Sequence, residues 1–192
     1  WLWGQLAVSA AQLMTHYGNE YLDQRADRAN RTPTRWAGGS RVLVEQLFPA
    51  RLALLTALFF GAAALAAGGV LTWIVRPGPP ALFITLILAA VLLAAGYSAP
   101  PLQLYSRGLG EATVAIVVAG LTPLLGYAGQ AGRLPDAAIL GLWPLLWLQF
   151  AMMLTLELPD AEGDAAAGKR TLVVRLGRPE DDVGRSRVDG QG

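Results

Sequence analysis

A short acidic cluster near the start of the chain has residue types and spacing that suit the binding of a divalent cation. It reads NEYLDQRAD over residues 19–27. Asn19, Asp23 and Asp27 stand four residues apart, which on a helix places all three on one face. An acidic series of this kind is often only a solvated helix end. A second acidic cluster nearby would favour cation binding over that interpretation.

The partner cluster reads ELPDAEGD over residues 157–164. In it, Asp160 and Asp164 repeat the four-residue spacing. Carboxylates beside a membrane are costly unless they bind a cation. Hard oxygen ligands in small clusters suit Mg²⁺, which keeps several waters and bridges carboxylates to substrate phosphates. Two such clusters on one membrane face would predict a shared metal and phosphate site.

The elements that carry these clusters are predicted to be membrane-spanning helices. The chain is 54% hydrophobic and 15% charged, and its apolar residues form blocks near the length of about 20 residues that crosses a bilayer. The absence of cysteine excludes disulfides and thiolate metal sites. We therefore expect an all-α, multi-pass transmembrane helical bundle. The predicted spans are 52–75, 81–97, 112–129 and 137–156, with 1–18 as a fifth.

The distribution of basic residues predicts the orientation of the spans. With five spans, the connections on one side of the membrane hold 13 of the 15 basic residues, and those on the other side hold only Arg76 and Arg133. The positive-inside rule places the basic side in the cytoplasm. Both acidic clusters then lie at the cytoplasmic face. We expect a bacterial cytoplasmic (inner) membrane protein with its active site facing the cytoplasm.

The two clusters together resemble the signature of the UbiA-type family of membrane aromatic prenyltransferases. That family carries N-D-x-x-D-x-x-x-D on one helix end and D-x-x-x-D on another, and this chain departs from the first only at Glu20. Further segments resemble the branch that acts on 1,4-dihydroxy-2-naphthoate. They are GGSRVL at 38–43, YSAPP at 97–101, RGLGE at 107–111 and GKRTLVVRLG at 168–177.

The resemblance covers residues 15–178 and implies a fold. The family forms a bundle of about nine helices around a central cavity, of which this chain would supply about five. Residues 1–178 would be a partial transmembrane domain, and we expect this piece alone to be inactive. Residues 179–192 are polar, lack apolar periodicity and are expected to be disordered.

The resemblance also implies roles for particular residues. Asn19, Asp23 and Asp27 would hold one Mg²⁺ and Asp160 and Asp164 another, with the four aspartates catalytic. The ions would bridge the diphosphate of a polyprenyl donor and stabilise its negative charge as the allylic bond breaks. The remaining candidates for substrate binding are Asn19, Arg28, Arg41, Tyr97, Arg107, Lys169 and Arg170.

Several alternatives remain open on the sequence. The acceptor in menaquinone biosynthesis would be dihydroxynaphthoate, but 4-hydroxybenzoate or another acceptor would suit the same family. A protein of a different class, which handles or conducts Mg²⁺ or other ions, would also need membrane carboxylates. The expected partners are the prenyl diphosphate, the aromatic acceptor and the lipid bilayer, without nucleic acid, and the oligomeric state is undetermined. His16, the one histidine, is predicted to pack between helices.

Overall fold

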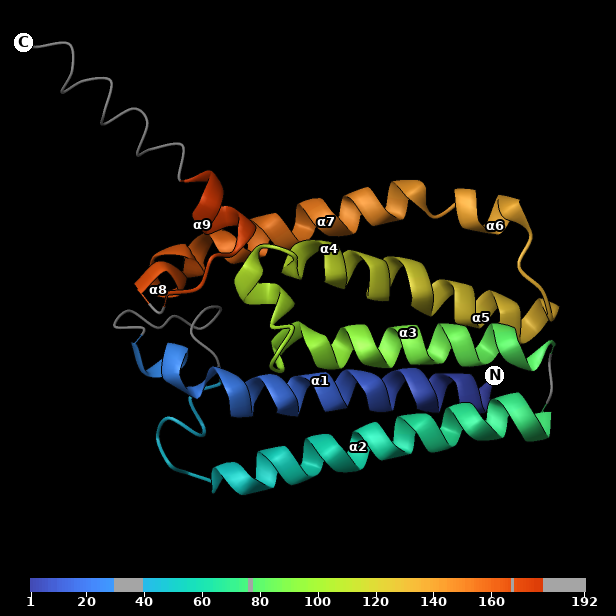
Figure 1. Cartoon of the computed structure of the whole chain (residues 1–192), viewed down its shortest axis with the longest axis horizontal. Helices are drawn as coiled ribbons and strands as arrows, with labels where there is room; N and C mark the ends of the chain where they lie inside the picture. The colour runs from blue at the N-terminus through green and yellow to red at the C-terminus, as the bar shows by residue number, and fades with distance from the viewer. Residues whose placement is uncertain (30–39, 76–77, 167, 178–192) are drawn as a thin grey trace, which may run out of the picture.

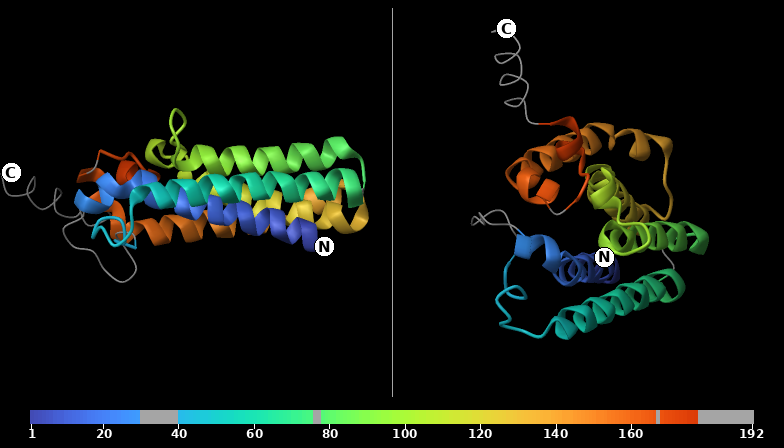
Figure 2. Two further views of the ribbon diagram at one scale, coloured as in Figure 1. Left: turned by 90° about the horizontal axis from the view of Figure 1, so that it is seen from below. Right: turned by 60° about the vertical axis from the view of Figure 1, so that its left-hand side comes forward.

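The protein is an all-α, multi-pass helical bundle, 81% helical in this computed structural model. The structure describes residues 1–29, 40–75, 78–166 and 168–177. Its long helices lie side by side and nearly parallel, with short connections at both ends (Figures 1 and 2). The chain therefore passes repeatedly between two ends of one elongated body.

The elements follow one another without any strand in the described ranges. The helices are α1 (Leu2–Ala29), α2 (Ala50–Val70), η1 (Leu71–Val75), α3 (Pro80–Ser98), η2 (Leu104–Arg107), α4 (Gly110–Val114), η3 (Ala115–Leu121), α5 (Thr122–Ala131), α6 (Asp136–Leu140), α7 (Trp143–Glu157), η4 (Leu158–Asp160), α8 (Ala161–Ala166) and α9 (Leu172–Leu176).

Four segments of the described chain are long and apolar enough to cross a membrane. They are Ala50–Ile74, Pro80–Ser98, Gly110–Ala131 and Asp136–Ala166. These confirm four of the predicted spans. The fifth, at the start of α1, lies within a 28-residue helix beside α2 and α3, but its composition is not apolar enough to place it among these spans.

Proline and glycine set several helix boundaries. Pro80 begins α3, where its missing N–H costs nothing because the first helical amides have no partner in the helix. The same helix ends at Ser98, shortly before the Pro100-Pro101 pair, which cannot continue it. Gly132 closes α5 in the left-handed conformation at φ 68°. The spans are thus delimited by the residues that ordinarily end helices.

The apolar core lies toward the end of the bundle remote from the acidic clusters. Its centre is Phe83 of α3, which is fully buried and packs with Leu71 and Leu125. Gly68 allows α2 to approach α3, because a Cβ at this position would lie 2.8 Å from Ile87. This tightly packed end fixes the helices whose other ends carry the polar residues.

Two stretches within the spans are π-helical, which the sequence did not lead us to expect. They are η1 and the seven-residue η3. In η3 the N–H of Thr122 reaches Val117 O, five residues back, and Pro123 follows at once. Local π-helix often occurs at functional sites because it widens the helix and redirects its side chains. In this protein η3 lies between α4 and α5.

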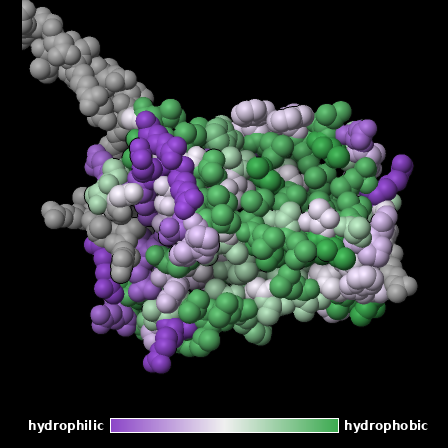
Figure 3. All heavy atoms as spheres, in the orientation of Figure 1, coloured by the Kyte–Doolittle hydropathy of each residue, from purple (hydrophilic) through white to green (hydrophobic). Residues whose placement is uncertain are grey.

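The surface has an apolar belt between two polar ends. Figure 3 shows hydrophilic residues gathered at the end that carries α8 and α9, with a few at the opposite end and mostly hydrophobic residues between. No residue of α7 is buried, and Trp147, Leu148 and Leu156 are exposed on it. This distribution is typical of helices in contact with lipid or with further apolar helices. The predicted disorder of residues 179–192 concerns residues outside the described ranges.

Candidate functional site

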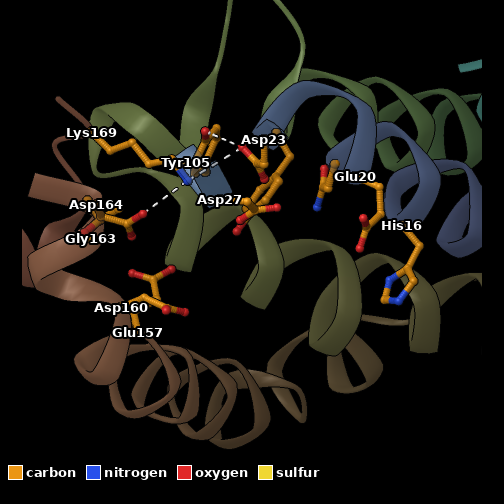
Figure 4. Close-up of a pocket in the computed structure, with 13 residues that line it drawn as sticks. His16, Glu20, Asp23, Asp27, Tyr105, Glu157, Asp160, Gly163, Asp164 and Lys169 are labelled. Carbon is orange, nitrogen blue, oxygen red and sulfur yellow. Dashed lines mark hydrogen bonds and ion pairs between the residues drawn. The ribbon is translucent and has the colours of Figure 1, made fainter. Parts of the chain in front are cut away.

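The polar end of the bundle that carries α8 and α9 contains a cavity of about 270 Å³, here called the acidic cavity. It lies where the end of α1 faces η4, α8 and the segment before α9 (Figure 4). The lining residues are His16, Asn19, Glu20, Asp23, Asp27, Tyr97, Tyr105, Glu157, Asp160, Gly163, Asp164, Lys169 and Thr171.

The first acidic cluster lines the cavity from one face of α1. Asn19, Asp23 and Asp27 all lie in this continuous helix, so the predicted four-residue spacing is realised in space. Glu20 also lines the cavity, and its Oε2 accepts a hydrogen bond of 2.7 Å from the hydroxyl of Ser40 in the connection after α1. Glu20, the residue that departs from the family pattern, therefore connects α1 to the segment around Ser40 by a hydrogen bond.

The second acidic cluster lines the opposite wall. Pro159 stands within the 3₁₀ turn η4, which joins α7 to α8. This turn and the first turn of α8 bring Asp160 and Asp164 to the cavity, across from Asp23 and Asp27 (Figure 4). The structure therefore brings together all four aspartates that the sequence singled out.

Lys169 links the two clusters. Its Nζ lies 3.1 Å from Asp164 Oδ1 and 3.6 Å from Asp23 Oδ1, and 4.5 Å from the centre of the Tyr105 ring. Burial of this ammonium lowers its pKa, but the negative charges of Asp23 and Asp164 outweigh that effect and raise its pKa above the ordinary value. Lys169 therefore stays charged and places a cation between the two walls.

Two stacked tyrosines form a third wall. The rings of Tyr97 and Tyr105 lie 5.5 Å apart, and the Tyr105 hydroxyl donates a hydrogen bond of 2.6 Å to Asp23 Oδ1. Burial of the Tyr105 phenol and this hydrogen bond raise its pKa, so it remains a donor. Asn19 is held in a similar way, because its Oδ1 accepts a bond of 2.6 Å from the Ser98 hydroxyl. Two of the three ligand candidates on α1, Asn19 and Asp23, are thereby oriented.

The electrostatics of the cavity favour a cation. Burial raises the pKa of Asp27 to about 6, and the negative charge of Asp23 adds to this effect, with smaller contributions from Glu20 and Asp160, while the positive charge of Lys169 acts in the opposite direction. Within the described residues, however, no group of three or more His, Cys, Asp or Glu side chains could hold a metal ion by itself. The carboxylates stand as separate pairs, a donor set that fits an ion which retains waters and shares a phosphate ligand.

The arginines predicted to bind substrate do not line the acidic cavity. Arg41 bonds to Asp27 O and pairs with Glu45, at distances of 3.3 and 3.6 Å. Arg107 donates to Pro101 O at 2.7 Å. Arg28 and Arg170 are exposed and are not among the lining residues. Of the predicted substrate-binding residues, the structure brings Asn19, Tyr97 and Lys169 to the cavity.

Six lining residues were not among the predicted site residues, namely His16, Glu20, Tyr105, Glu157, Gly163 and Thr171. His16 is exposed and lines the cavity, so the prediction that it packs between helices is wrong. His16 lies three residues before Asn19 and four before Glu20, and this spacing could have placed it on the same helix face. Tyr105 gave no such signal, because the chain reaches the cavity there through the short turn η2 after the Pro100-Pro101 pair.

A buried glutamate holds the segment that carries Lys169. Glu111, at the start of α4, is fully buried, and its Oε1 accepts a hydrogen bond of 2.8 Å from the Leu172 N–H. Arg170 N–H donates to Ser106 O at 2.9 Å, which adds a second tie between the same two parts of the chain. These bonds fix residues 168–172 against η2 and α4, and so fix the backbone of Lys169.

We expect Glu111→Leu to destabilise this end of the protein by about 1–3 kcal/mol, because the Leu172 N–H would be buried without an acceptor. Glu111→Gln keeps a carbonyl oxygen at the same place and should cost less. Thermal unfolding of the two variants in detergent, with the rate of tryptic cleavage after Lys169 as a local probe, measures the difference. Equal losses in the two variants would contradict this role of the hydrogen bond.

A second, mostly apolar cavity of about 320 Å³ adjoins the first and is here called the apolar cavity. It runs between α1, α3 and the α4–η3 stretch. Its lining residues are Val8, Ala11, Gln12, Thr15, His16, Asn19, Ala90, Ala94, Tyr97, Thr113, Val114, Val117, Val118 and Thr122. His16, Asn19 and Tyr97 line both cavities. A ligand with a charged head and an apolar tail could therefore lie across the boundary between them.

Comparison with known proteins identifies the chain. The model of the UbiA prenyltransferase family matches residues 1–181, which include every lining residue of both cavities. No curated protein and no solved structure matches the chain. Because the family match extends over nearly the whole chain and both acidic clusters lie within it, the protein belongs to the UbiA prenyltransferase family.

Proposed function

We propose that the protein transfers a polyprenyl group from an isoprenoid diphosphate to 1,4-dihydroxy-2-naphthoate. One observation carries the proposal: two pairs of aspartates on separate elements face one cavity, and this cavity shares His16, Asn19 and Tyr97 with an adjoining apolar cavity. A prenyl diphosphate has a matching division between a charged head and an apolar chain. Family membership favours this chemistry over the handling or conduction of ions.

The diphosphate would lie in the acidic cavity together with Mg²⁺. Asn19, Asp23 and Asp27 would hold one ion, and Asp160 and Asp164 would hold another. These amide and carboxylate side chains offer the hard oxygen donors that Mg²⁺ prefers. The bound ions would neutralise the diphosphate and stabilise the charge that develops on it. Carboxylates alone would repel the substrate, so we expect transfer to depend on the metal.

Lys169 would supply further positive charge from the protein itself. Its ammonium lies between Asp23 and Asp164 and could contact a diphosphate oxygen there without leaving the cavity. Tyr105 would keep Asp23 in one orientation through its hydrogen bond. A fixed arrangement of charges stabilises a departing anion better than a mobile one, because little rearrangement is needed as the bond breaks.

The reaction would occur at the boundary of the two cavities. As the allylic C–O bond breaks, its electron pair leaves with the diphosphate, and the ring carbon of the acceptor forms the new C–C bond. With dihydroxynaphthoate, the carboxylate leaves as CO₂ and returns its electron pair to the ring, so the step balances without an oxidant. The apolar wall and the stacked tyrosines would keep water from the allylic cation.

The acceptor rests on the four segments that resemble the dihydroxynaphthoate branch, and 4-hydroxybenzoate remains the alternative acceptor. Residues 168–177 of that set contain Lys169 and contact η2 through the Arg170 N–H. We further propose that the site opens to the cytoplasm of a bacterium, in its inner membrane, because the basic residues concentrate at this end of the spans.

Prenylation of dihydroxynaphthoate should be observed when the protein, expressed at full length in membranes, receives labelled prenyl diphosphate and Mg²⁺. The lipid-soluble product would be followed with both acceptors offered in parallel, and chelation of Mg²⁺ should abolish it. Product from 4-hydroxybenzoate alone would preserve the mechanism and refute the acceptor. Undiminished transfer in the presence of a chelator would refute the role of the metal.

A further inference from the structure

The outer wall of the apolar cavity separates it from a third, smaller cavity. This outer cavity measures about 110 Å³ and is lined by Gln5, Leu71 and Gln130 among others, toward the opposite end of the bundle. Val8 of α1 and Thr122 of α5 line both the apolar and the outer cavity. The acidic, apolar and outer cavities therefore follow one another along α1, and these two side chains stand at the second boundary.

Each member of this boundary is held in place. Val8 packs at the edge of the apolar core that contains Leu71 and Leu125. Thr122 follows the π-helix η3, and both its N–H and its hydroxyl donate to Val117 O, the hydroxyl at 2.9 Å. Its polar groups are thus satisfied within the helix. A β-branched side chain on each helix is a stiff boundary.

The distance from the diphosphate site to this boundary sets the length of prenyl chain that the apolar cavity can hold. Val8 precedes Asn19 by 11 residues on one continuous helix, or about 16 Å. A chain that starts from a diphosphate beside Asn19 and follows α1 through the apolar cavity would reach Val8 and Thr122 at its far end. We infer that Val8 and Thr122 determine the length of the prenyl chain that this protein prefers. The inference rests on the proposed prenyl transfer.

Changes in the size of Val8 should shift chain-length preference in opposite directions. Val8→Ala opens the boundary, so the ratio of kcat/KM for solanesyl over farnesyl diphosphate should rise about tenfold, and Val8→Trp should lower it about tenfold. The test offers geranyl, farnesyl, geranylgeranyl and solanesyl diphosphates together and measures product lengths by mass spectrometry. Leu6→Trp, which introduces the same side chain at an exposed position of α1 that lines neither cavity, should leave the ratio unchanged.

A second pair of variants protects the test against misfolding. Thr122→Leu should also favour shorter chains, whereas Thr122→Val keeps the shape and should keep the length profile. Retained transfer from geranyl diphosphate shows that a variant is folded. An unchanged profile in Val8→Ala, Val8→Trp and Thr122→Leu would overturn the inference and would mean that long chains leave the apolar cavity sideways into the bilayer.

A binding measurement separates this inference from the proposed reaction. A long prenyl diphosphate with a photoreactive group at its far end should label the apolar cavity in the parent protein, and should also label peptides that contain Gln5 or Gln130 in Val8→Ala. This readout needs no acceptor or turnover. Labelling that follows this pattern in a protein without transferase activity would refute the reaction alone, and labelling that ignores Val8 would refute the boundary.

Discussion

Replacement of Asp23 or Asp160 by asparagine should reduce prenyl transfer by about a thousandfold. Each substitution removes a carboxylate charge from one wall of the acidic cavity and leaves a side chain of nearly the same shape. Because the proposed transition state concentrates charge on the diphosphate, the loss should appear in kcat more than in KM. The measurement is the rate of formation of prenylated dihydroxynaphthoate in membranes, at saturating Mg²⁺ and prenyl diphosphate.

Asp136→Asn provides the matched control. Asp136 lies exposed in the first turn of α6, at the other end of the bundle from the acidic cavity. The same chemical change there should leave the rate within about twofold, since exposed substitutions away from specific contacts have small effects. If Asp23→Asn and Asp160→Asn behaved like this control, neither cluster could be part of the active site.

Lys169→Met should lower the rate by about a hundredfold, the second largest effect that we expect. Methionine keeps the length of the stem and removes the ammonium that contacts Asp164 and Asp23. The loss should appear in both the KM for prenyl diphosphate and kcat, because the charge would bind the substrate and also stabilise the leaving diphosphate. Steady-state kinetics over a range of prenyl diphosphate concentrations separates the two contributions.

The neighbouring residue makes this test specific. Arg170→Met removes one positive charge at the next position, but Arg170 is exposed and does not line the cavity. It should retain most of the rate, and Lys169→Arg should retain more than Lys169→Met. Equal losses in Lys169→Met and Arg170→Met would show that the general positive charge of this segment matters rather than the contact that Lys169 makes.

The spans were predictable because lipid imposes a simple pattern on sequence. A helix that crosses a bilayer needs a long apolar run, and Pro80 and the Pro100-Pro101 pair delimit one such run clearly. The start of α1 was harder to interpret, because its glutamines and His16 interrupt the apolar pattern. The π-helix η3 had no visible signal, since a change in hydrogen-bond register leaves composition unaltered.

The acidic pairs were predictable for a different reason. Within one helix, four-residue spacing fixes a common face, and this applied to Asn19, Asp23 and Asp27. Two hydrogen bonds of the site join residues that are far apart in sequence. One links Glu111 to the Leu172 N–H, and the other links Tyr105 to Asp23. Such contacts depend on how the helices pack, and no local pattern reports them. The roles proposed for the arginines also depended on packing, and the structure leaves all four predicted arginines outside the cavity.

The π-helical stretch 115–121 takes up one residue more than an α-helix would use over the same rotation. Removing one residue from this stretch and restoring the α pitch should therefore leave Leu125 and Ala128 facing the core in which they are now buried. Removing one residue from a regular α-helical part of the same helix would instead turn everything that follows by about 100°. The π-helix thus lets one continuous helix carry an extra residue while Glu111 at one end and Leu125 at the other both keep their buried positions.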